Sequence, residues 1–215
     1  RLAPTSLLSV TLMNINSVWH PTITYGAYRD WDGKPMASPP PFYEGVDDFT
    51  ADTLTAVSDE IMAVKEVLLK RYADRGLDLG ALRHVRDWML RAYGDDVADK
   101  SSLRASINTN KGYRGLKHPT IKQEDGTYLP NWGYRYITED IPCGLVVTAG
   151  IAELCGVPAP RMADVIRFGQ SKMGKEFVAE DGTVSGPDIG MTRAPQRWGY
   201  KDLDTFMVEM GYLSS

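Results

Sequence analysis

The stretch that decides the fold runs from Phe49 to Tyr72 and reads FTADTLTAVSDEIMAVKEVLLKRY. Its apolar residues recur at steps of three or four, a spacing that places them on one face of a helix. They are Leu54, Val57, Ile61, Val64, Leu68 and Tyr72. Asp48 or Thr50 is expected to cap the start, and Gly76 lies just beyond the end. The spacing therefore predicts a long amphipathic helix that packs on a core.

Similar patterns on both sides of this stretch predict further helices. We expect them at residues 5–27, 79–93, 141–154, 161–173 and 203–212. Thr5 or Ser6 is the expected N-cap of the first, and Pro21 should kink or end it because proline has no N–H to donate. Residues 141–154 form the most hydrophobic of these segments, with Pro142 in its first turn.

Two segments between the predicted helices are irregular in composition. Residues 28–46 carry four prolines, which is typical of a loop that wraps the body or forms a lid. Residues 108–140 are rich in glycine, asparagine and aromatic residues, and a loop of that length usually has a task. No strand-like alternation longer than a few residues occurs. The prediction is a single all-α domain, residues 1–215, with two long loops.

Composition excludes several classes of protein. Of the 215 residues, 43% are hydrophobic and 24% are charged, values typical of a globular chain and not of a disordered one. There is no apolar run long enough to span a membrane. The net charge of -4 argues against nucleic-acid binding. Two cysteines suit a reducing cytoplasm. The chain begins with Arg1, so we expect it to be part of a longer protein.

Histidines are the first candidates for chemistry, and the chain has three of them. His20 precedes Pro21 and lies four residues after Asn16, so on a helix these two polar side chains share a face. The alternative is that His20 simply closes a helix. His118 also precedes a proline, and His84 is expected on the surface of an amphipathic helix.

The sequence offers little for a metal site. It has no pair of cysteines or histidines at the spacing of a metal-binding motif. Cys143 and Cys155 lie about 120° apart on a helical wheel and are expected to be buried thiols on an apolar helix. A metal site assembled from distant loops is the remaining alternative.

A charged cluster directly precedes the most hydrophobic segment, in the sequence RYITEDIP at residues 135–142. Asp140 could cap that helix by accepting backbone N–H groups. It could equally hold the second ring nitrogen of a histidine, as a catalytic dyad requires. Arg135 offers a planar fork for a carboxylate or phosphate, with an ordinary surface ion pair as its alternative.

No phosphate-binding loop is present in the sequence. Neither G-x-G-x-x-G after a strand nor G-x-x-x-x-G-K-[ST] occurs, so this chain by itself is not expected to hold a dinucleotide in the manner of a Rossmann domain.

Two of these elements together carry a resemblance to a known family. The Asn-x-x-x-His-Pro element at residues 16–21 and RYITEDIPCGL at residues 135–145 resemble the C-terminal helical domain of the octopine/nopaline (opine) dehydrogenase family, in order and spacing across the chain. Cys143 departs from the pattern, where an aromatic residue is common. The resemblance implies a multi-helix domain like that of 6-phosphogluconate dehydrogenase-type enzymes. It also implies an N-terminal Rossmann domain upstream that is absent from this chain.

The resemblance further implies an activity. Members of the family are NAD(P)-dependent enzymes that condense an amino acid with a 2-oxo acid such as pyruvate and reduce the imine. The cofactor, NAD(H) or NADP(H), is held mainly by the Rossmann domain, so the isolated chain is expected to be inactive. By motif position, His20 is the acid/base histidine, Asp140 orients it, and Arg135 lies near anionic groups.

Substrate contacts follow from the same resemblance, which implies that Asn16, Tyr136 and Trp132 bind substrate. Because catalysis then needs the dyad, His20 and Asp140 are predicted to lie close enough for a hydrogen bond, directly or through one water, in a cleft facing the Rossmann domain. A different class of function stays open, in which the fold is kept as a non-catalytic ligand-binding or dimerisation module. Ketopantoate and glycerol-3-phosphate dehydrogenases are a third possibility. They rely on a catalytic lysine, so the pairing of His20 with Asp140 argues against them.

Overall fold

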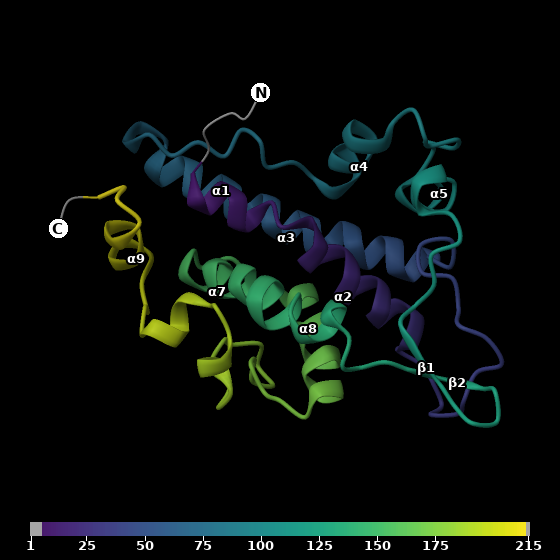
Figure 1. Ribbon diagram of the computed structural model, residues 1–215. Coiled ribbons are helices and arrows are strands. Elements are labelled where there is room, and N and C mark those ends of the chain that lie inside the picture. Colours follow the sequence, from purple (N-terminus) through teal and green to yellow (C-terminus); the bar gives the residue numbers. More distant parts are fainter. Residues whose placement is uncertain (1–5, 214–215) are drawn as a thin grey trace.

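The structure is a computed structural model that describes residues 6–213. Its longest helix is α3 (Asp48–Tyr72), and α2 (Ile15–Tyr28) packs along it (Figure 1). The short helix α1 (Leu7–Leu12) precedes α2 and contacts α7 (Val146–Leu154). In Figure 1 the strands lie at the opposite end of the molecule from the C-terminal helix α9 (Leu203–Glu209). The chain thus builds a helical body with a loop-rich end.

The other elements follow in chain order. The α-helices are α4 (Val85–Tyr93), α5 (Leu103–Asn108), α6 (Arg135–Thr138), α7 (Val146–Leu154) and α8 (Pro160–Met173). The strands are β1 (Thr120–Lys122) and β2 (Tyr128–Pro130). Short turns of other helix types are η1 (Ala73–Arg75), η2 (Lys111–Tyr113), η3 (Ile141–Leu145), η4 (Ile189–Met191) and η5 (Pro195–Trp198). Among the residues described, no helix is both long enough and apolar enough to cross a membrane.

Helix α3 has almost the bounds that its apolar spacing predicts. All six of its predicted apolar positions are buried in the core. The cap prediction was wrong by one residue, because the Asp47 carboxylate accepts the Thr50 N–H at 2.8 Å. Asp47 has extended backbone, as an N-cap residue requires, whereas Asp48 is already helical.

The first predicted helix is divided in two, but not at its proline. Ser6 caps α1 by accepting the Ser9 N–H at 3.0 Å, while Thr5 lies outside the described residues. The backbone leaves helical geometry at Asn14, and α2 then continues through Pro21. Proline has a helical φ, and the costs of its missing N–H and of its ring crowding the carbonyl four residues back can be offset where the helix packs on a core, as α2 does through the buried Val18, Trp19 and Ile23. The alternative that Pro21 ends the helix was therefore wrong, and the kink stays a prediction.

The helix predicted at residues 79–93 begins later, at Val85. Leu79 and Leu82 are buried, as the periodicity requires, but they belong to a turn and an irregular segment. His84 is the N-cap of α4, where its imidazole accepts the Arg86 N–H at 3.3 Å. The expectation that His84 is simply a surface residue was therefore incomplete.

The most hydrophobic segment opens with a widened turn. Residues 141–145 form the π-helix η3, in which the Leu145 N–H donates to the carbonyl of Asp140, five residues back, at 2.9 Å. Cys143 on this turn is exposed and Cys155 is half-buried, so the prediction of two buried thiols was wrong for Cys143. The extra residue in the turn shifts the helical wheel from which the burial was predicted.

The two predicted loops pair with each other. Residues 29–47 are irregular, and Met36 bridges to Tyr128 while Pro41 bridges to Lys117. The second loop contains an antiparallel hairpin in which Ile121 pairs with Leu129. This hairpin is the exception to the all-α prediction, and it closes around a turn with Gly126 at positive φ.

Candidate active site

The structure brings His20 and Asp140 together across 120 positions of sequence. The His20 Nδ1 and Asp140 Oδ2 atoms lie 2.7 Å apart, which confirms the predicted hydrogen bond. A carboxylate only accepts, so Nδ1 carries the hydrogen and Nε2 is left to face a reactant. Both side chains are 12% exposed, buried enough to strengthen the interaction yet within reach of a small molecule. The Asp140 side chain makes no helix-capping hydrogen bond, so the capping alternative was wrong.

A close approach of two backbones sets this pairing. Gly144 of η3 lies against Ser17 of α2, and a Cβ atom at residue 144 would overlap the Ser17 side chain. Ser17 lies one turn before His20, and Gly144 lies four residues after Asp140. The contact therefore fixes the register in which the histidine meets the carboxylate.

The widened turn helps to orient the Asp140 side chain toward His20. The Asp140 N–H donates to the Arg135 carbonyl at 3.2 Å, again five residues back, and its own carbonyl accepts from Leu145. Two successive π-type bonds rotate Asp140 away from the direction that a regular α-helix would give it. Behind the turn, Gly169 of α8 leaves room for the side chain of Ile141.

Aromatic rings enclose the imidazole. Tyr136 stacks on His20 with ring centroids 3.7 Å apart, and Phe42 meets the same imidazole at 5.9 Å with a steep interplanar angle. Tyr134 in turn packs its ring edge to face with Tyr136 at 4.9 Å. Burial, with smaller contributions from the charges of Tyr134 and Asp140, raises the pKa of Tyr136, so its hydroxyl is neutral near pH 7. The dyad thus lies against an uncharged aromatic wall.

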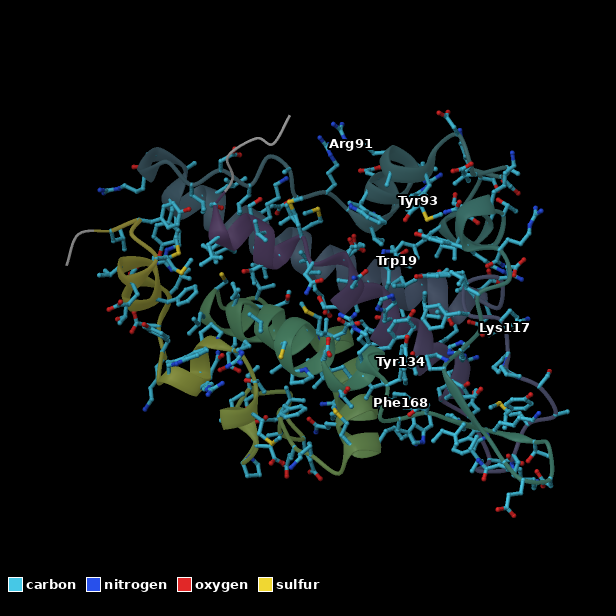
Figure 2. All side chains as sticks on the ribbon, viewed as in Figure 1. Trp19, Arg91, Tyr93, Lys117, Tyr134 and Phe168 are labelled. Carbon is cyan, nitrogen blue, oxygen red and sulfur yellow. The ribbon has the colours of Figure 1, made fainter. Side chains whose placement is uncertain are left out.

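Aromatic side chains continue from this wall through the molecule. Figure 2 shows Tyr93, Trp19, Tyr134 and Phe168 following one another across the helical body. Trp19, adjacent to His20 in sequence, packs on Tyr43 with ring centroids 6.2 Å apart. Burial raises the pKa of Tyr43 well above its ordinary value, so this layer is uncharged too.

Arg135 and Asn16 are both exposed, and among the described residues no side-chain contact joins either of them to the dyad. The Arg135 guanidinium forms an ion pair with Glu139, Nη2 to Oε2, at 3.1 Å, and its side chain is 63% exposed. The structure therefore shows the surface ion pair that was the alternative for this residue, in a position that an anion can reach. Asn16 is exposed on α2, one turn before His20.

Trp132 is not brought to the dyad. Its indole packs with Tyr28 at 5.3 Å and with Phe168 at 6.0 Å, and the Lys172 ammonium lies 5.4 Å from its ring centre. It lines a cavity of about 480 Å³ that Cys143 and Lys172 also line. Of the three residues predicted to bind substrate, Tyr136 is the one whose side chain lies against the imidazole in the described part of the chain.

His118 is a second buried histidine, and its setting could not be inferred from the sequence. It is only 3% exposed, and its Nδ1 atom has no hydrogen-bond partner among the described residues. Burial lowers its pKa to about 3 and raises that of the neighbouring Tyr28 to about 12. The one available signal, a following proline, is shared with His20 and does not separate the two.

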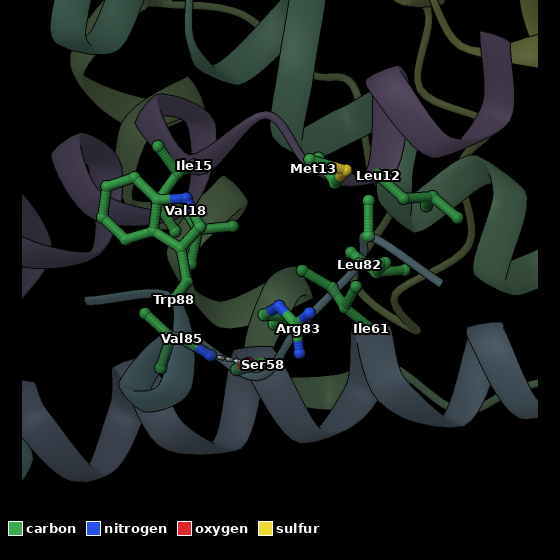
Figure 3. A pocket seen from close by; sticks show the side chains of 11 residues that line it. Leu12, Met13, Ile15, Val18, Ser58, Ile61, Leu82, Arg83, Val85 and Trp88 are labelled. Carbon is green, nitrogen blue, oxygen red and sulfur yellow. Dashed lines mark hydrogen bonds between the residues drawn. The ribbon is translucent and has the colours of Figure 1, made fainter. Parts of the chain in front are cut away.

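A small apolar cavity lies away from the dyad. It measures about 20 Å³ and lies between α3, α4 and the break after α1, where the Val85 N–H donates to Ser58 Oγ (Figure 3). Its lining is mostly apolar, with Trp88 on one side, and it holds about one water molecule at most. Within residues 6–213, no group of three histidine, cysteine or acidic side chains is placed to hold a metal ion.

Comparisons with known proteins identify the family of the chain. The sequence model of the NAD/NADP octopine/nopaline dehydrogenase α-helical domain matches residues 4–173. Tauropine dehydrogenase of Arabella iricolor is 45% identical over 202 residues, 94% of this chain and 50% of that protein. Octopine dehydrogenase of Mizuhopecten yessoensis is 42% identical over 93% of this chain and 49% of that protein. The chain thus spans about half the length of these relatives.

Solved structures show the same fold. A structure of octopine dehydrogenase with NADH and L-arginine superposes with a TM-score of 0.88 and 39% identity, covering 97% of this chain and 50% of that one. A second, with NADH and pyruvate, gives 0.83 and 37% over 97% of this chain and 49% of that one. From the family match, the identities and the shared fold, the chain belongs to the octopine/nopaline dehydrogenase family, as its α-helical domain.

Proposed function

We propose that this chain is the acid–base half of an NAD(P)-dependent opine dehydrogenase. The full enzyme would join the amino group of an amino acid to the carbonyl carbon of a 2-oxo acid such as pyruvate and reduce the resulting imine. The observation that carries the proposal is the 2.7 Å contact between His20 and Asp140. Relatives that are opine, octopine and tauropine dehydrogenases support it.

The dyad suits the proton transfers of the condensation. As the amine adds to the carbonyl carbon, the His20 imidazolium gives its Nε2 proton to the carbonyl oxygen. The nitrogen of the adduct then returns a proton to Nε2, which passes it to the new hydroxyl group, so that the C–O bond breaks and water leaves as the C=N bond forms. The Asp140 carboxylate keeps Nδ1–H as a donor and stabilises the imidazolium before transfer. The hydride for the imine comes from NADH or NADPH, which we propose is held mainly by an N-terminal Rossmann domain outside this chain.

The remaining assignments are parts of the same proposal. Arg135 would bind the carboxylate of the oxo acid, since its guanidinium is exposed and offers two parallel N–H groups. Asn16 would contact the amino acid from the helix face that also carries His20. Trp132 would contact a part of the substrate remote from the reacting atoms, in the cavity that it lines. A non-catalytic module would have no need of a carboxylate behind an imidazole.

The test is an activity assay on the full-length protein. NADH or NADPH consumption is followed with pyruvate and a panel of amino acids that includes L-arginine, and the product is identified by mass spectrometry. We expect cofactor oxidation only when both substrates are present, with a product whose mass equals the reduced condensate. A folded, cofactor-binding protein that oxidises neither cofactor with any pair would contradict the proposal and favour the non-catalytic module.

A further inference from the structure

Tyr136 covers one face of the His20 imidazole as a nearly parallel stack. The ring centroids lie 3.7 Å apart and the ring planes differ by 19°. Phe42, the other aromatic ring in contact with His20, meets it at 64° and 5.9 Å. The contact with Tyr136 is therefore the one that can define the plane of the imidazole.

The dyad gains from such a contact, because a hydrogen bond tolerates some departure from the plane of the donor ring. With Nδ1 held by Asp140, the imidazole can still rock through a limited angle about its Cβ–Cγ bond. Such a rotation would swing Nε2, the atom that faces the reactant, away from its productive direction. Proton transfer depends on that direction, since small misplacements of a catalytic group cost large factors in rate.

Tyr136 is itself held in place. Phe42 packs against it at 5.1 Å, and Tyr134 meets its ring at nearly a right angle. Tyr136 also lies four residues before Asp140, so one short segment delivers both the carboxylate and the ring to His20. The stack and the hydrogen bond are thereby coupled through the backbone of α6 and η3.

The ring face, and not the hydroxyl, makes this contact. No hydrogen bond joins the Tyr136 hydroxyl to another residue within the described part of the chain, and burial raises its pKa, so it is not an anion near pH 7. We infer that Tyr136 is a positioning residue that fixes the plane of the His20 imidazole, in place of the substrate-binding role that the resemblance implies. This inference rests on the proposed function.

Two substitutions separate the ring from the hydroxyl in the full-length enzyme. Tyr136→Phe keeps the stack, so kcat should stay within about threefold of wild type; Tyr136→Leu removes it, so kcat should fall by about tenfold while KM for both substrates changes little. Tyr128→Leu is the matched control, because it removes a half-buried tyrosine of β2 that has no role in the site. The control should keep full activity.

A second readout does not depend on activity. The imidazole proton resonances of His20, assigned by their absence in His20→Gln, should be shifted upfield by the stacked ring. They should move downfield in Tyr136→Leu and stay in place in Tyr136→Phe. If the His20 resonances did not move in Tyr136→Leu, the two rings would not be stacked in the protein.

The kinetic outcomes decide the positioning role. An unchanged kcat in Tyr136→Leu would overturn the positioning role. Equal losses of kcat in Tyr136→Phe and Tyr136→Leu would also overturn it, because they would show that the hydroxyl group matters and that Tyr136 binds substrate. If the wild-type enzyme oxidises neither cofactor, the proposed function fails, and the positioning role fails with it. The resonances still decide whether the stack exists.

Discussion

His20 and His118 occupy two regions that look alike in sequence and differ in chemistry. Each is followed by proline, and each packs on Phe42, with ring centroids 5.9 and 4.5 Å away. His20 has a carboxylate partner and some exposure, whereas the Nδ1 of His118 is buried without a partner among residues 6–213 and its pKa is lowered to about 3. A charged partner and access to reactants therefore mark the candidate catalytic histidine, while the dipeptide alone does not.

The largest effect expected from this comparison is on catalysis. His20→Gln keeps the size and a hydrogen-bond donor but removes the titrating nitrogen, so kcat should fall by at least about a hundredfold with little change in Tm. His118→Leu, at the other histidine, should leave kcat within about threefold of wild type. Steady-state kinetics and thermal unfolding of both variants check this. A His20→Gln enzyme with more than about a tenth of wild-type kcat would make His20 structural.

The next largest effect is a loss of folding stability in acid, and His118 is its expected cause. Because the folded pKa is about 3 and the ordinary value is 6.5, the unfolded chain takes up a proton in this window that the folded protein does not. The free energy of unfolding should therefore fall as pH drops below about 6, by up to about 1.4 kcal/mol for each pH unit from this group.

Denaturant unfolding of His118→Leu as a function of pH isolates that contribution. The variant has no imidazole to protonate, so its stability relative to wild type should rise steadily from pH 6 toward pH 4. A difference between the two proteins that does not change with pH would show that the His118 imidazole titrates normally in the fold.

A smaller effect is expected when the partner of His20 loses its charge. Asp140→Asn keeps an acceptor for Nδ1–H but does not stabilise the imidazolium, so kcat should fall by about tenfold, less than for His20→Gln. Steady-state kinetics in the reductive direction check this prediction. A kcat equal to that of wild type would mean that the Asp140 charge does not act on the imidazolium.

The smallest expected effect concerns Arg135. Arg135→Lys keeps the charge but not the planar fork, so KM for the oxo acid should rise severalfold while kcat changes less. Glu139→Gln is the matched control, because it removes only the ion-pair partner of Arg135. Equal changes in KM for the oxo acid in the two variants would mean that Arg135 forms only its surface ion pair and does not bind substrate.

Much of the helical body could be predicted from the sequence, because a long apolar repeat at steps of three or four residues fits a helix and does not fit a strand. Helix α3 follows its spacing almost to the residue. At Leu79 and Leu82 the same spacing wrongly predicted a helix, because an irregular segment can also bury leucines at helical intervals. The hairpin was missed because its strands have three residues each, too short for an alternation to be recognised.

The pairing of His20 with Asp140 was predictable, but the rest of the site and its geometry were not. The two motifs supplied His20 and Asp140, but the π-turn that aims Asp140 and exposes Cys143 depends on backbone bonds that no residue pattern specifies. The stack of Tyr136 on His20 depends in the same way on tertiary packing, and so does the burial of His118.

The most direct test of the dyad is a double-mutant cycle on kcat with His20→Gln, Asp140→Asn and the double variant. If Asp140 acts only through the imidazole, removing the carboxylate charge from an enzyme that already lacks His20 should cost little. We predict a kcat for the double variant within about threefold of His20→Gln alone, a strongly non-additive result. Two losses that simply multiply would contradict the dyad, because His20 and Asp140 would then act independently.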